Sequence, residues 1–237
     1  MHIALMGHGK MGRALEALLS QEENDHCAGF YTAFGPPEGR IDVLVDFSHP
    51  GNLERVLGAA AAQKLPLVIG TTGYDIAQKQ AIREAAQNLP IVQAENFSIG
   101  MAVLRRLAAE AAQILDGAFD IEIVEMHHGQ KADTPSGTAR ALLERIDPEG
   151  RYKIVCGRDS EGPRGQEIGV HAVRGGTAAG VHSVLFFGQQ EELELRHRAD
   201  SREIFARGAL KAAAFVLHAP PGLYSMEDVL FGGKQDG

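Results

Sequence analysis

The chain has 237 residues, of which 44% are hydrophobic and 23% are charged, and this composition excludes a disordered chain. Its formal net charge of −8 argues against a nucleic-acid-binding surface and against attraction to anionic lipid. No apolar run approaches the roughly 20 residues of a membrane-spanning helix, and the sequence opens directly on an apolar segment without a basic stretch before it. We therefore expect a cytoplasmic protein that binds neither nucleic acid nor a membrane.

Short apolar runs alternate with helical patterns as far as Gln93. Near-continuous apolar strands that alternate with helices predict a parallel sheet covered by helices on both faces, as in a Rossmann-type α/β domain. The predicted strands are Ile3–Met6, Asp25–Thr32, Val43–Phe47, Pro66–Gly70 and Pro90–Gln93, and the predicted helices are Lys10–Ser20, Asn52–Gln63 and Ile76–Asn88.

The pattern changes near Asn96, which predicts a second domain. From Ile168 onward apolar residues alternate with a period of two, and this alternation predicts antiparallel strands joined by glycine-containing turns. A helical stripe after Asp200 indicates a helix that returns to the first domain. In chain order we expect a helix at Met101–Leu115, a strand at Asp120–Met126, a loop and helix at Gly129–Ile146, strands at Gly169–Arg174, His182–Gly188 and Glu192–His197, and an apolar tail at Leu223–Phe231.

A G-x-G-x-x-G sequence follows the first predicted strand and opens the first predicted helix. Its glycines permit a tight turn and a close approach of the backbone to a pyrophosphate, and the helix N-terminus supplies amides to the phosphates. The alternative is a glycine-rich turn that binds nothing. The six residues are Gly7, His8, Gly9, Lys10, Met11 and Gly12.

The end of the second predicted strand departs from the usual dinucleotide-binding pattern. NAD-binding proteins commonly have an acidic residue here, and NADP-binding proteins an arginine, but Phe30–Thr32 is uncharged. The choice between NADH and NADPH therefore stays open. Gly70, Thr71 and Thr72 lie at the end of the fourth predicted strand, where open parallel sheets bind ligands, and an ordinary strand-to-helix turn is the alternative.

His127, His128 and Lys131 concentrate hydrogen-bond donors in an otherwise acidic chain. This grouping predicts a site for an anionic substrate beside a residue that transfers protons. Three alternatives stay open: a metal site, structural histidines, and a solvated basic loop. A metal site lacks a carboxylate or cysteine at a familiar ligand spacing, and we expect no metal.

A helix is predicted to follow this group, capped by Asp133 or Thr134 and with Pro135 in its first turn. Amides in the first turn of a helix have no partner within it and suit a carboxylate. The amides predicted to be free are those of Ser136, Gly137 and Thr138.

Glu125–Ala139 resembles the E-x-H-H-x-x-K-x-D-x-P-S-G-T-A signature of the 4-hydroxy-tetrahydrodipicolinate reductases, the dihydrodipicolinate reductase family, at every specified position. Departures are the uncharged end of the second strand, a shortened link at Ala33–Arg40, and Gly129 and Gln130, where many relatives have more basic residues. Other segments similar to the family are Val45–Ser48, Gly70–Gly73, Asn96–Gly100 and Gly222–Leu230.

The resemblance implies reduction of 4-hydroxy-tetrahydrodipicolinate to tetrahydrodipicolinate by NADH or NADPH, with loss of water, in lysine biosynthesis through diaminopimelate. It gives His127 a proton donor and acceptor role and Lys131 a proton-donor role. The implied substrate-binding residues are His128, Ser136, Gly137 and Thr138, and the implied cofactor-binding residues are Gly7, His8, Gly9, Lys10, Met11, Gly12, Gly70, Thr71, Thr72, Ala94, Glu95, Asn96 and Phe97.

The resemblance also implies a discontinuous fold. Residues 1–98 and 202–237 would form a Rossmann-type dinucleotide-binding domain, and residues 99–201 an inserted α+β domain whose mixed sheet binds the small dicarboxylate substrate and builds a homotetramer. Two other functions remain open: a dehydrogenase of similar build that acts on a carbonyl compound, and a non-catalytic dinucleotide-binding regulator.

Overall fold

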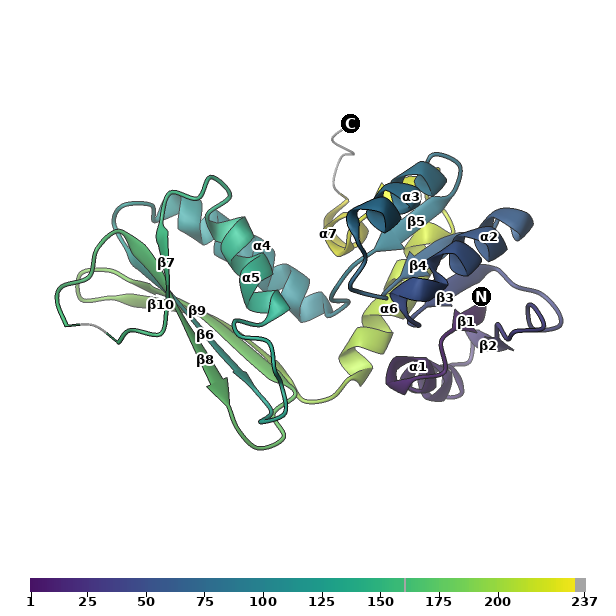
Figure 1. Cartoon of the computed structure of the whole chain (residues 1–237), viewed down its shortest axis with the longest axis horizontal. Helices are drawn as coiled ribbons and strands as arrows, with labels where there is room; N and C mark the ends of the chain where they lie inside the picture. Colours follow the sequence, from purple (N-terminus) through teal and green to yellow (C-terminus); the bar gives the residue numbers. More distant parts are fainter. Residues whose placement is uncertain (160, 233–237) are drawn as a thin grey trace. The chain divides into compact units, whose positions relative to one another are not determined.

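The structure is a computed structural model that describes residues 1–159 and 161–232 (Figure 1). Residue 160 and residues 233–237, which fall within the predicted domain ranges, lie outside the described residues. The chain divides into two compact units, Met1–Ile99 together with the residues from Arg202 onward, and Gly100–Ser201. It stays a prediction that the first unit binds the dinucleotide and that the second unit binds the substrate.

The first unit is built on a six-stranded parallel sheet with the strand order β11-β5-β4-β3-β1-β2. The central strands β1, β3 and β4 are buried almost completely, as expected for a sheet with both faces covered. This architecture confirms the predicted Rossmann-type fold. The strands are β1 (His2–Met6), β2 (His26–Phe30), β3 (Val43–Asp46), β4 (Leu67–Ile69), β5 (Pro90–Gln93) and β11 (Gly222–Tyr224).

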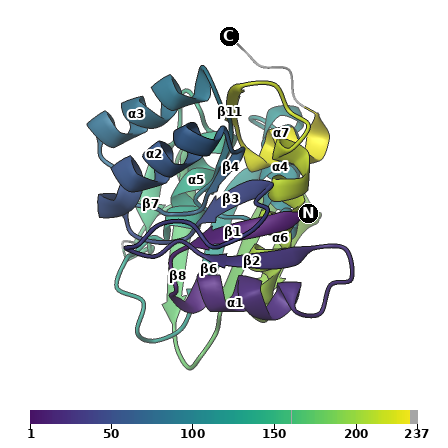
Figure 2. The same cartoon turned by 90° about the vertical axis from the view of Figure 1, so that its right-hand side faces the viewer.

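Helices cover both faces of this sheet (Figure 2). On one face, α2 and α3 bury Val56, Ala60 and Ile82 against Leu44 and Leu67. On the other, α6 packs against β3, β4 and β5 and against α1. The helix after Asp200 therefore packs within the first unit. The helices are α1 (Lys10–Leu19), the short η1 (Pro50–Asn52), α2 (Leu53–Gln63), α3 (Ile76–Ala86), α6 (Glu203–Val216) and α7 (Met226–Phe231).

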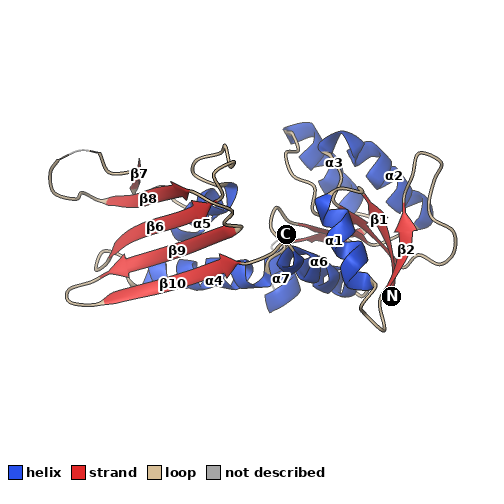
Figure 3. Cartoon of the chain, turned by 90° about the horizontal axis from the view of Figure 1, so that it is seen from below, coloured by secondary structure: helices blue, strands red, loops and turns tan. Residues whose placement is uncertain are grey.

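The second unit contains a five-stranded mixed sheet with the order β10-β9-β6-β8-β7. Its two helices among residues 100–159 and 161–201 both pack on one face, where Leu104 and Leu142 meet Ile123 and Val170 (Figure 3). The opposite face therefore carries no described helix of its own unit. The elements are α4 (Ile99–Ile114), β6 (Asp120–His127), α5 (Gly137–Ile146), β7 (Lys153–Cys156), β8 (Glu167–Arg174), β9 (Gly180–Phe187) and β10 (Glu192–Ala199).

Three strands of the structure differ from the sequence prediction. β8 runs antiparallel to β9 as predicted, but it does not pair with it: β6 lies between them, and β8 pairs in parallel with β6 and β7. A period of two reports that one face of a strand is buried, but it carries no information on the direction of the neighbouring strand. β7 and β11 were not predicted, because each is short and β7 is largely exposed. No helix in the described part of the chain has the length and apolar character needed to cross a membrane.

Candidate active site

The predicted glycine sequence forms the turn between β1 and α1. Gly7 has a φ of +99°, and an added Cβ would lie 2.4 Å from the carbonyl oxygen of Phe47. A Cβ on Gly12 would lie 2.0 Å from the carbonyl oxygen of Gly7. Gly9 occupies the N-cap position of α1 and has no side chain that could accept from the first-turn amides. Gly7 and Gly12 are therefore needed for the tight packing of the turn itself, while the open space beside Gly9 at the helix start suits a pyrophosphate.

The carboxyl ends of β3 and β4 are tied together next to this turn. The amide of Gly70 donates to the carbonyl oxygen of Asp46 (2.8 Å), and the amide of Ser48 donates to Oγ1 of Thr71 (2.8 Å). A Cβ on Gly70 would overlap the ring of Phe47. Asp46 is completely buried, and burial raises its pKa despite hydrogen bonds from its neighbours, Ser48 first among them. These contacts fix the predicted turn at the edge of the sheet.

The last predicted cofactor residues follow β5. The amide of Ala94 donates to the end of β4 (3.1 Å), and Oδ1 of Asn96 accepts from the amide of Ser98 (2.9 Å). Phe97 is buried with its ring edge-on to Phe47. The three segments predicted to line the cofactor therefore all follow the carboxyl ends of parallel strands in one sheet. The exposed members of the predicted set are His8, Gly9, Lys10, Thr72 and Glu95.

A positive charge that the sequence does not reveal lies at the end of β2. Arg55, in the first turn of α2, donates to the carbonyl oxygen of Thr32. Arg40, the nearest arginine in sequence, instead pairs with Asp42 (2.7 Å). Sequence spacing gives no sign of Arg55 because α2 follows β3, and only the strand order β3-β1-β2 brings the start of α2 near this end of the sheet.

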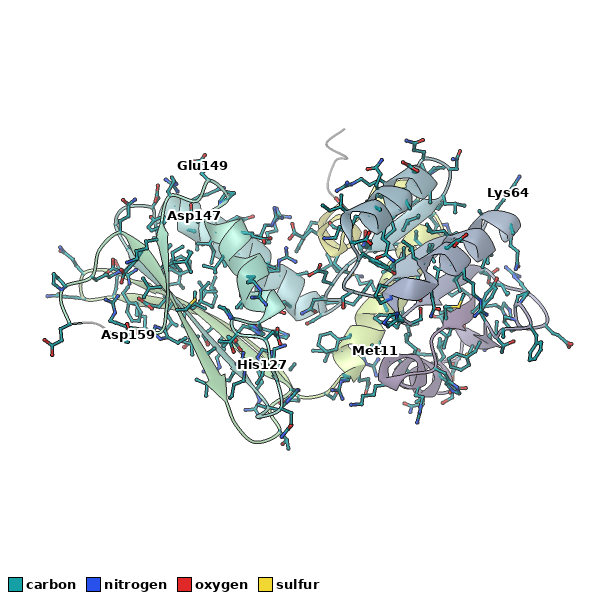
Figure 4. The ribbon with its side chains drawn as sticks, viewed as in Figure 1. Met11, Lys64, His127, Asp147, Glu149 and Asp159 are labelled. Carbon is teal, nitrogen blue, oxygen red and sulfur yellow. The ribbon has the colours of Figure 1, made fainter. Side chains whose placement is uncertain are left out.

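In the second unit, the first part of the signature forms the carboxyl end of β6, where His127 is labelled in Figure 4. Side chains alternate along a strand, so Glu125 and His127 point to the same buried face as Ile121 and Ile123. Glu125 is completely buried, and its Oε2 lies 2.5 Å from Nδ1 of His127. A carboxylate on the apolar face of a strand is costly unless partners compensate its charge.

Glu125 has such partners. Nη1 of Arg174 lies 2.8 Å from Oε2 of Glu125 and Nη2 lies 2.7 Å from Oε1, while the amide of Ser136 donates to Oε1 (3.0 Å). Burial alone would raise the pKa of Glu125, but the hydrogen bonds from Arg174, His127 and Ser136 outweigh it and hold the pKa below its usual range. Glu125 is therefore ionised at neutral pH, with Arg174 as its counter-ion.

Two buried histidines stand beside this carboxylate. Burial lowers the pKa of His127, and Glu125 opposes that shift. The ring of His182 lies edge-on to His127, 5.1 Å between centroids, and its Nε2 is 3.2 Å from Oγ of Ser136. Burial, assisted by the nearby His127, lowers the pKa of His182 to about 4. Both rings are therefore neutral at neutral pH.

The helix α5 begins later than the sequence prediction. Ser136 is its N-cap, with extended backbone and with Oγ accepting from the amide of Ala139 (3.1 Å). Pro135 therefore precedes the helix, and the predicted caps Asp133 and Thr134 are wrong. The hydroxyl of Ser136 competes successfully because it reaches the third amide of the helix, which is the usual geometry of a serine cap.

One of the three amides predicted to be free at the start of α5 has a partner in the structure. The amide of Ser136 donates to Glu125 and is not a free donor. The carboxylate of Asp133 lies at the start of the helix, 2.8 Å from Nζ of Lys131. Lys131, followed by weaker effects that include the amide of Gly137, lowers the pKa of Asp133. In this structure the predicted donors Lys131 and Gly137 thus face a carboxylate of the chain itself.

Backbone hydrogen bonds hold the segment after β6 in place. The amide of Gly175 donates to the carbonyl oxygen of His127 (3.0 Å), and the amide of Gly129 donates to that of Gly176 (3.3 Å). His128 is half-buried, and its carbonyl oxygen accepts from the amide of Lys131 (3.1 Å). The structure therefore brings the predicted catalytic and substrate-binding residues together in one segment of one unit. Among residues 1–159 and 161–232, no group of three or more His, Cys, Asp or Glu is placed to hold a metal ion.

Comparison with known proteins identifies the family. Residues 100–230 match the family described as "Dihydrodipicolinate reductase, C-terminus", and residues 30–97 match "Dihydrodipicolinate reductase, N-terminus". The chain belongs to the dihydrodipicolinate reductase family. A 4-hydroxy-tetrahydrodipicolinate reductase of Akkermansia muciniphila is 45% identical over 94% of each chain. One of Caldanaerobacter subterraneus subsp. tengcongensis is 41% identical over 95% of this chain and 96% of the relative.

A solved structure supports the same family. The dipicolinate-bound dihydrodipicolinate reductase of Paenisporosarcina sp. TG-14 is 25% identical and covers 98% of this chain and 99% of its own, with a TM-score of 0.78. A probable dehydrogenase from Thermotoga maritima, 11% identical with a TM-score of 0.62, shares the fold alone. The family resemblance of the signature is thereby confirmed.

The sequence analysis gave no role to three residues of this site: Glu125, Arg174 and His182. A signal was present for two of them, Glu125 and His182. Strand alternation puts Glu125 in line with Ile121 and Ile123, and it puts His182 in line with buried residues of β9. A titratable residue at the buried phase of a strand predicts a compensated polar cluster.

Proposed function

We propose that this protein reduces 4-hydroxy-tetrahydrodipicolinate to tetrahydrodipicolinate, with loss of water and with NADH or NADPH as the hydride donor, in lysine biosynthesis through diaminopimelate. Membership of the dihydrodipicolinate reductase family supports the reaction. The observation that carries the proposal is the set of donors in the segment from the end of β6 to the start of α5, which includes His127 and Lys131. A dehydrogenase of a carbonyl compound would not need this pairing of a proton donor with a carboxylate site.

The cofactor is proposed to bind at the carboxyl edge of the parallel sheet in the first unit. Gly7 and Gly12 allow the turn after β1 to pack tightly against the chain's own backbone, and the space beside Gly9 is open for a ligand. The uncapped start of α1 offers amides to a pyrophosphate. Bound NADH or NADPH supplies the hydride, and the residues after β4 and β5 are proposed to hold its nicotinamide half.

The substrate is proposed to bind through its carboxylates to His128, Lys131 and the first amides of α5, those of Gly137 and Thr138. Since Lys131 and Gly137 face Asp133 in this structure, a substrate carboxylate takes the place of the Asp133 carboxylate. The two negative charges of the substrate raise the pKa of His127, which burial lowers in the free protein. Substrate binding thus promotes protonation of the residue that must donate a proton.

The proton that follows hydride addition is proposed to come from His127, with Lys131 as a second donor. Hydride addition to a conjugated imine leaves an electron-rich atom, and a positioned acid that protonates it commonly accelerates a reaction by roughly 10²–10⁴. Lys131 also stabilises negative charge that develops on the substrate.

The experiment that tests this function follows NADH and NADPH oxidation with enzymatically generated 4-hydroxy-tetrahydrodipicolinate. Substrate-dependent oxidation supports the proposal, and its absence with both cofactors contradicts it. Calorimetry with pyridine-2,6-dicarboxylate, a planar stand-in for the substrate, tests the carboxylate site separately. We expect binding that strengthens once cofactor is present, whereas no binding at millimolar ligand contradicts the site.

We further propose that the protein is a cytoplasmic homotetramer in which neighbouring chains cover exposed apolar side chains of the mixed sheet. Val173 on β8 and Phe187 on β9 expose large apolar side chains there. Large exposed apolar side chains of this kind favour a covering partner. Light scattering at micromolar concentration is expected to give four times the chain mass, and a monomer mass contradicts the proposal.

A further inference from the structure

We propose that Glu125 is a positioning residue that keeps a proton on Nδ1 of His127, so that Nε2 is the atom that exchanges a proton with the substrate. Arg174 is the counter-ion that holds Glu125 in this role. The inference rests on the proposed function for the identity of the reaction, but its central statement concerns which nitrogen of His127 carries a proton. That statement can be measured without turnover.

The hydrogen-bond geometry decides what Glu125 can do. Four donor positions converge on its two oxygens: Nη1 and Nη2 of Arg174, the amide of Ser136, and Nδ1 of His127. Arg174 and the backbone amide can only donate. An ionised carboxylate only accepts, and it therefore satisfies all of these groups when Nδ1 of His127 carries its proton. The opposite tautomer would set an acceptor 2.5 Å from an acceptor in a buried place.

The surroundings of the other nitrogen fit a proton-exchanging atom. Nε2 of His127 lies beside Gly180 at the start of β9, and a Cβ added there would lie 3.2 Å from Nε2. Glycine at this position thus leaves the approach to Nε2 open. The charged and titratable groups that face His127 are Glu125 and Lys131 from β6 and its following loop, Arg174 from β8, and His182 from β9.

Arg174 has a second contact that couples the histidine to the substrate segment. Its Nη2 donates to the carbonyl oxygen of Asp133 (2.7 Å) as well as to Glu125. The amide of Ser136 donates to Glu125 from the other end of the same segment. One carboxylate and its counter-ion therefore set both the tautomer of His127 and the position of the segment that starts α5.

The proton balance of the step follows from this arrangement. Protonated His127 carries protons on both nitrogens. The Nε2–H bond breaks as the proton passes to the reduced substrate, and the Nδ1 proton stays in its hydrogen bond to Glu125. The neutral ring that remains is the tautomer that Glu125 stabilises, and solvent returns the proton to Nε2 for the next turnover. No group other than the substrate is reduced.

The test combines NMR of histidine labelled with ¹⁵N with steady-state kinetics. The His127→Gln variant assigns the signal of His127. In the unaltered protein, at a pH where the ring is neutral, we expect Nδ1 to carry the proton. A dominant Nε2–H tautomer would overturn the inference, even if the enzyme oxidises NADPH with the proposed substrate. Conversely, an Nδ1–H tautomer in a protein without that activity would leave this inference standing and remove the proposed function.

The variant Glu125→Gln sharpens the test. The glutamine amide must turn its NH₂ group toward one pair of donors, and when it faces His127 the ring must accept at Nδ1 and shift its proton to Nε2. We expect an increased Nε2–H population and a fall in kcat of at least about tenfold, up to the effect of losing His127 itself. KM for the substrate should change less than kcat. An unchanged tautomer and an unchanged kcat would show that Glu125 is only structural.

Two further variants keep the test decisive. Glu125→Asp preserves the charge and the four donors but shortens the reach, so the Nδ1–H tautomer should persist while kcat falls. If Glu125→Gln fails to fold, the Glu125→Asp variant is used in its place. The matched control is Glu122→Gln, which removes the charge of a glutamate that also binds a histidine and an arginine but lies on the other face of β6. It should leave the His127 tautomer unchanged and kcat within about threefold.

Discussion

The mixed sheet carries two clusters with the same composition on its two faces. On the face covered by helices, Glu125 binds His127 and Arg174. On the opposite face, Glu122 binds His171 (2.8 Å) and Arg164. The side chains of Glu125 and His127 are 0% and 10% exposed, whereas those of Glu122 and His171 are 18% and 38% exposed. Identical residue types therefore occur in very different solvent environments within one sheet.

Burial decides what each cluster can do. Water near Glu122 weakens its ion pairs and can replace a lost partner. Glu125 has no access to water, so every lone pair must meet a protein donor, and loss of a partner leaves an uncompensated charge. The inner cluster is therefore rigid and can hold one tautomer of a histidine. The outer cluster chiefly ties the segment near Arg164, which also donates to the carbonyl oxygen of Ile121 (3.1 Å), to the sheet.

The largest expected difference concerns catalysis. His127→Gln should lower kcat by roughly 10²–10⁴, the usual effect of losing a positioned acid, with little change in cofactor affinity. His171→Gln, in the outer cluster, should leave kcat within about threefold. Steady-state kinetics with both variants would check this, and a His127→Gln enzyme within threefold of the unaltered one would show that the proton-transfer assignment is wrong.

Replacing the arginine of each cluster should lower the free energy of unfolding by different amounts. Arg174→Met leaves Glu125 buried without its counter-ion and should lower the free energy of unfolding by about 3–5 kcal/mol. Arg164→Met affects partly exposed partners and should cost about 1 kcal/mol. Urea unfolding of both variants measures the difference. Equal losses would mean that the burial of Glu125 is not what distinguishes the two faces.

The third expectation concerns the pH dependence of stability. The pKa of His182 is about 4 in the folded chain and about 6.5 when unfolded. Between these values the unfolded chain binds more protons, so stability is lost as the pH falls from about 6.5 to 4, by up to roughly 3 kcal/mol. His182→Gln should flatten this part of the profile. Parallel profiles for His182→Gln and the unaltered protein would refute the assignment.

The smallest effect is expected in the first unit, where Arg55 lies at the uncharged end of β2. We expect kcat/KM values for NADH and NADPH within about tenfold, equivalent to roughly 1.4 kcal/mol of discrimination. Arg55→Ala should shift the ratio toward NADH by about 3- to 10-fold, and Arg40→Ala, which removes a cation held by Asp42, should shift it less. A hundredfold preference in the unaltered enzyme would show that another residue recognises the 2′ position.

The fold was largely predictable because its periodicities are strong. Continuous apolar runs between helical patterns indicated the parallel sheet, and alternating residues after Ile168 indicated the strands of the second unit. The neighbours of β8 were not predictable, because β6, which is distant in sequence, comes to lie between β8 and β9. The start of α5 was also misjudged, since Asp133, Thr134 and Ser136 are all good caps and the choice depends on contacts with Glu125 and His182.

The sequence by itself determined the family, the reaction class it implies, the glycine turn and the group of donors from His127 to Thr138, because these rest on residue types at fixed local spacing. Only the tertiary structure decided the partners of Glu125 and the position of the Arg55 charge at the end of β2. It also showed that the amide of Ser136, predicted to be free, donates to Glu125. These features join residues as far apart in the chain as Glu125 and Arg174. Burial and strand pairing, which set pKa values and hydrogen-bond roles, exist only once the chain is folded.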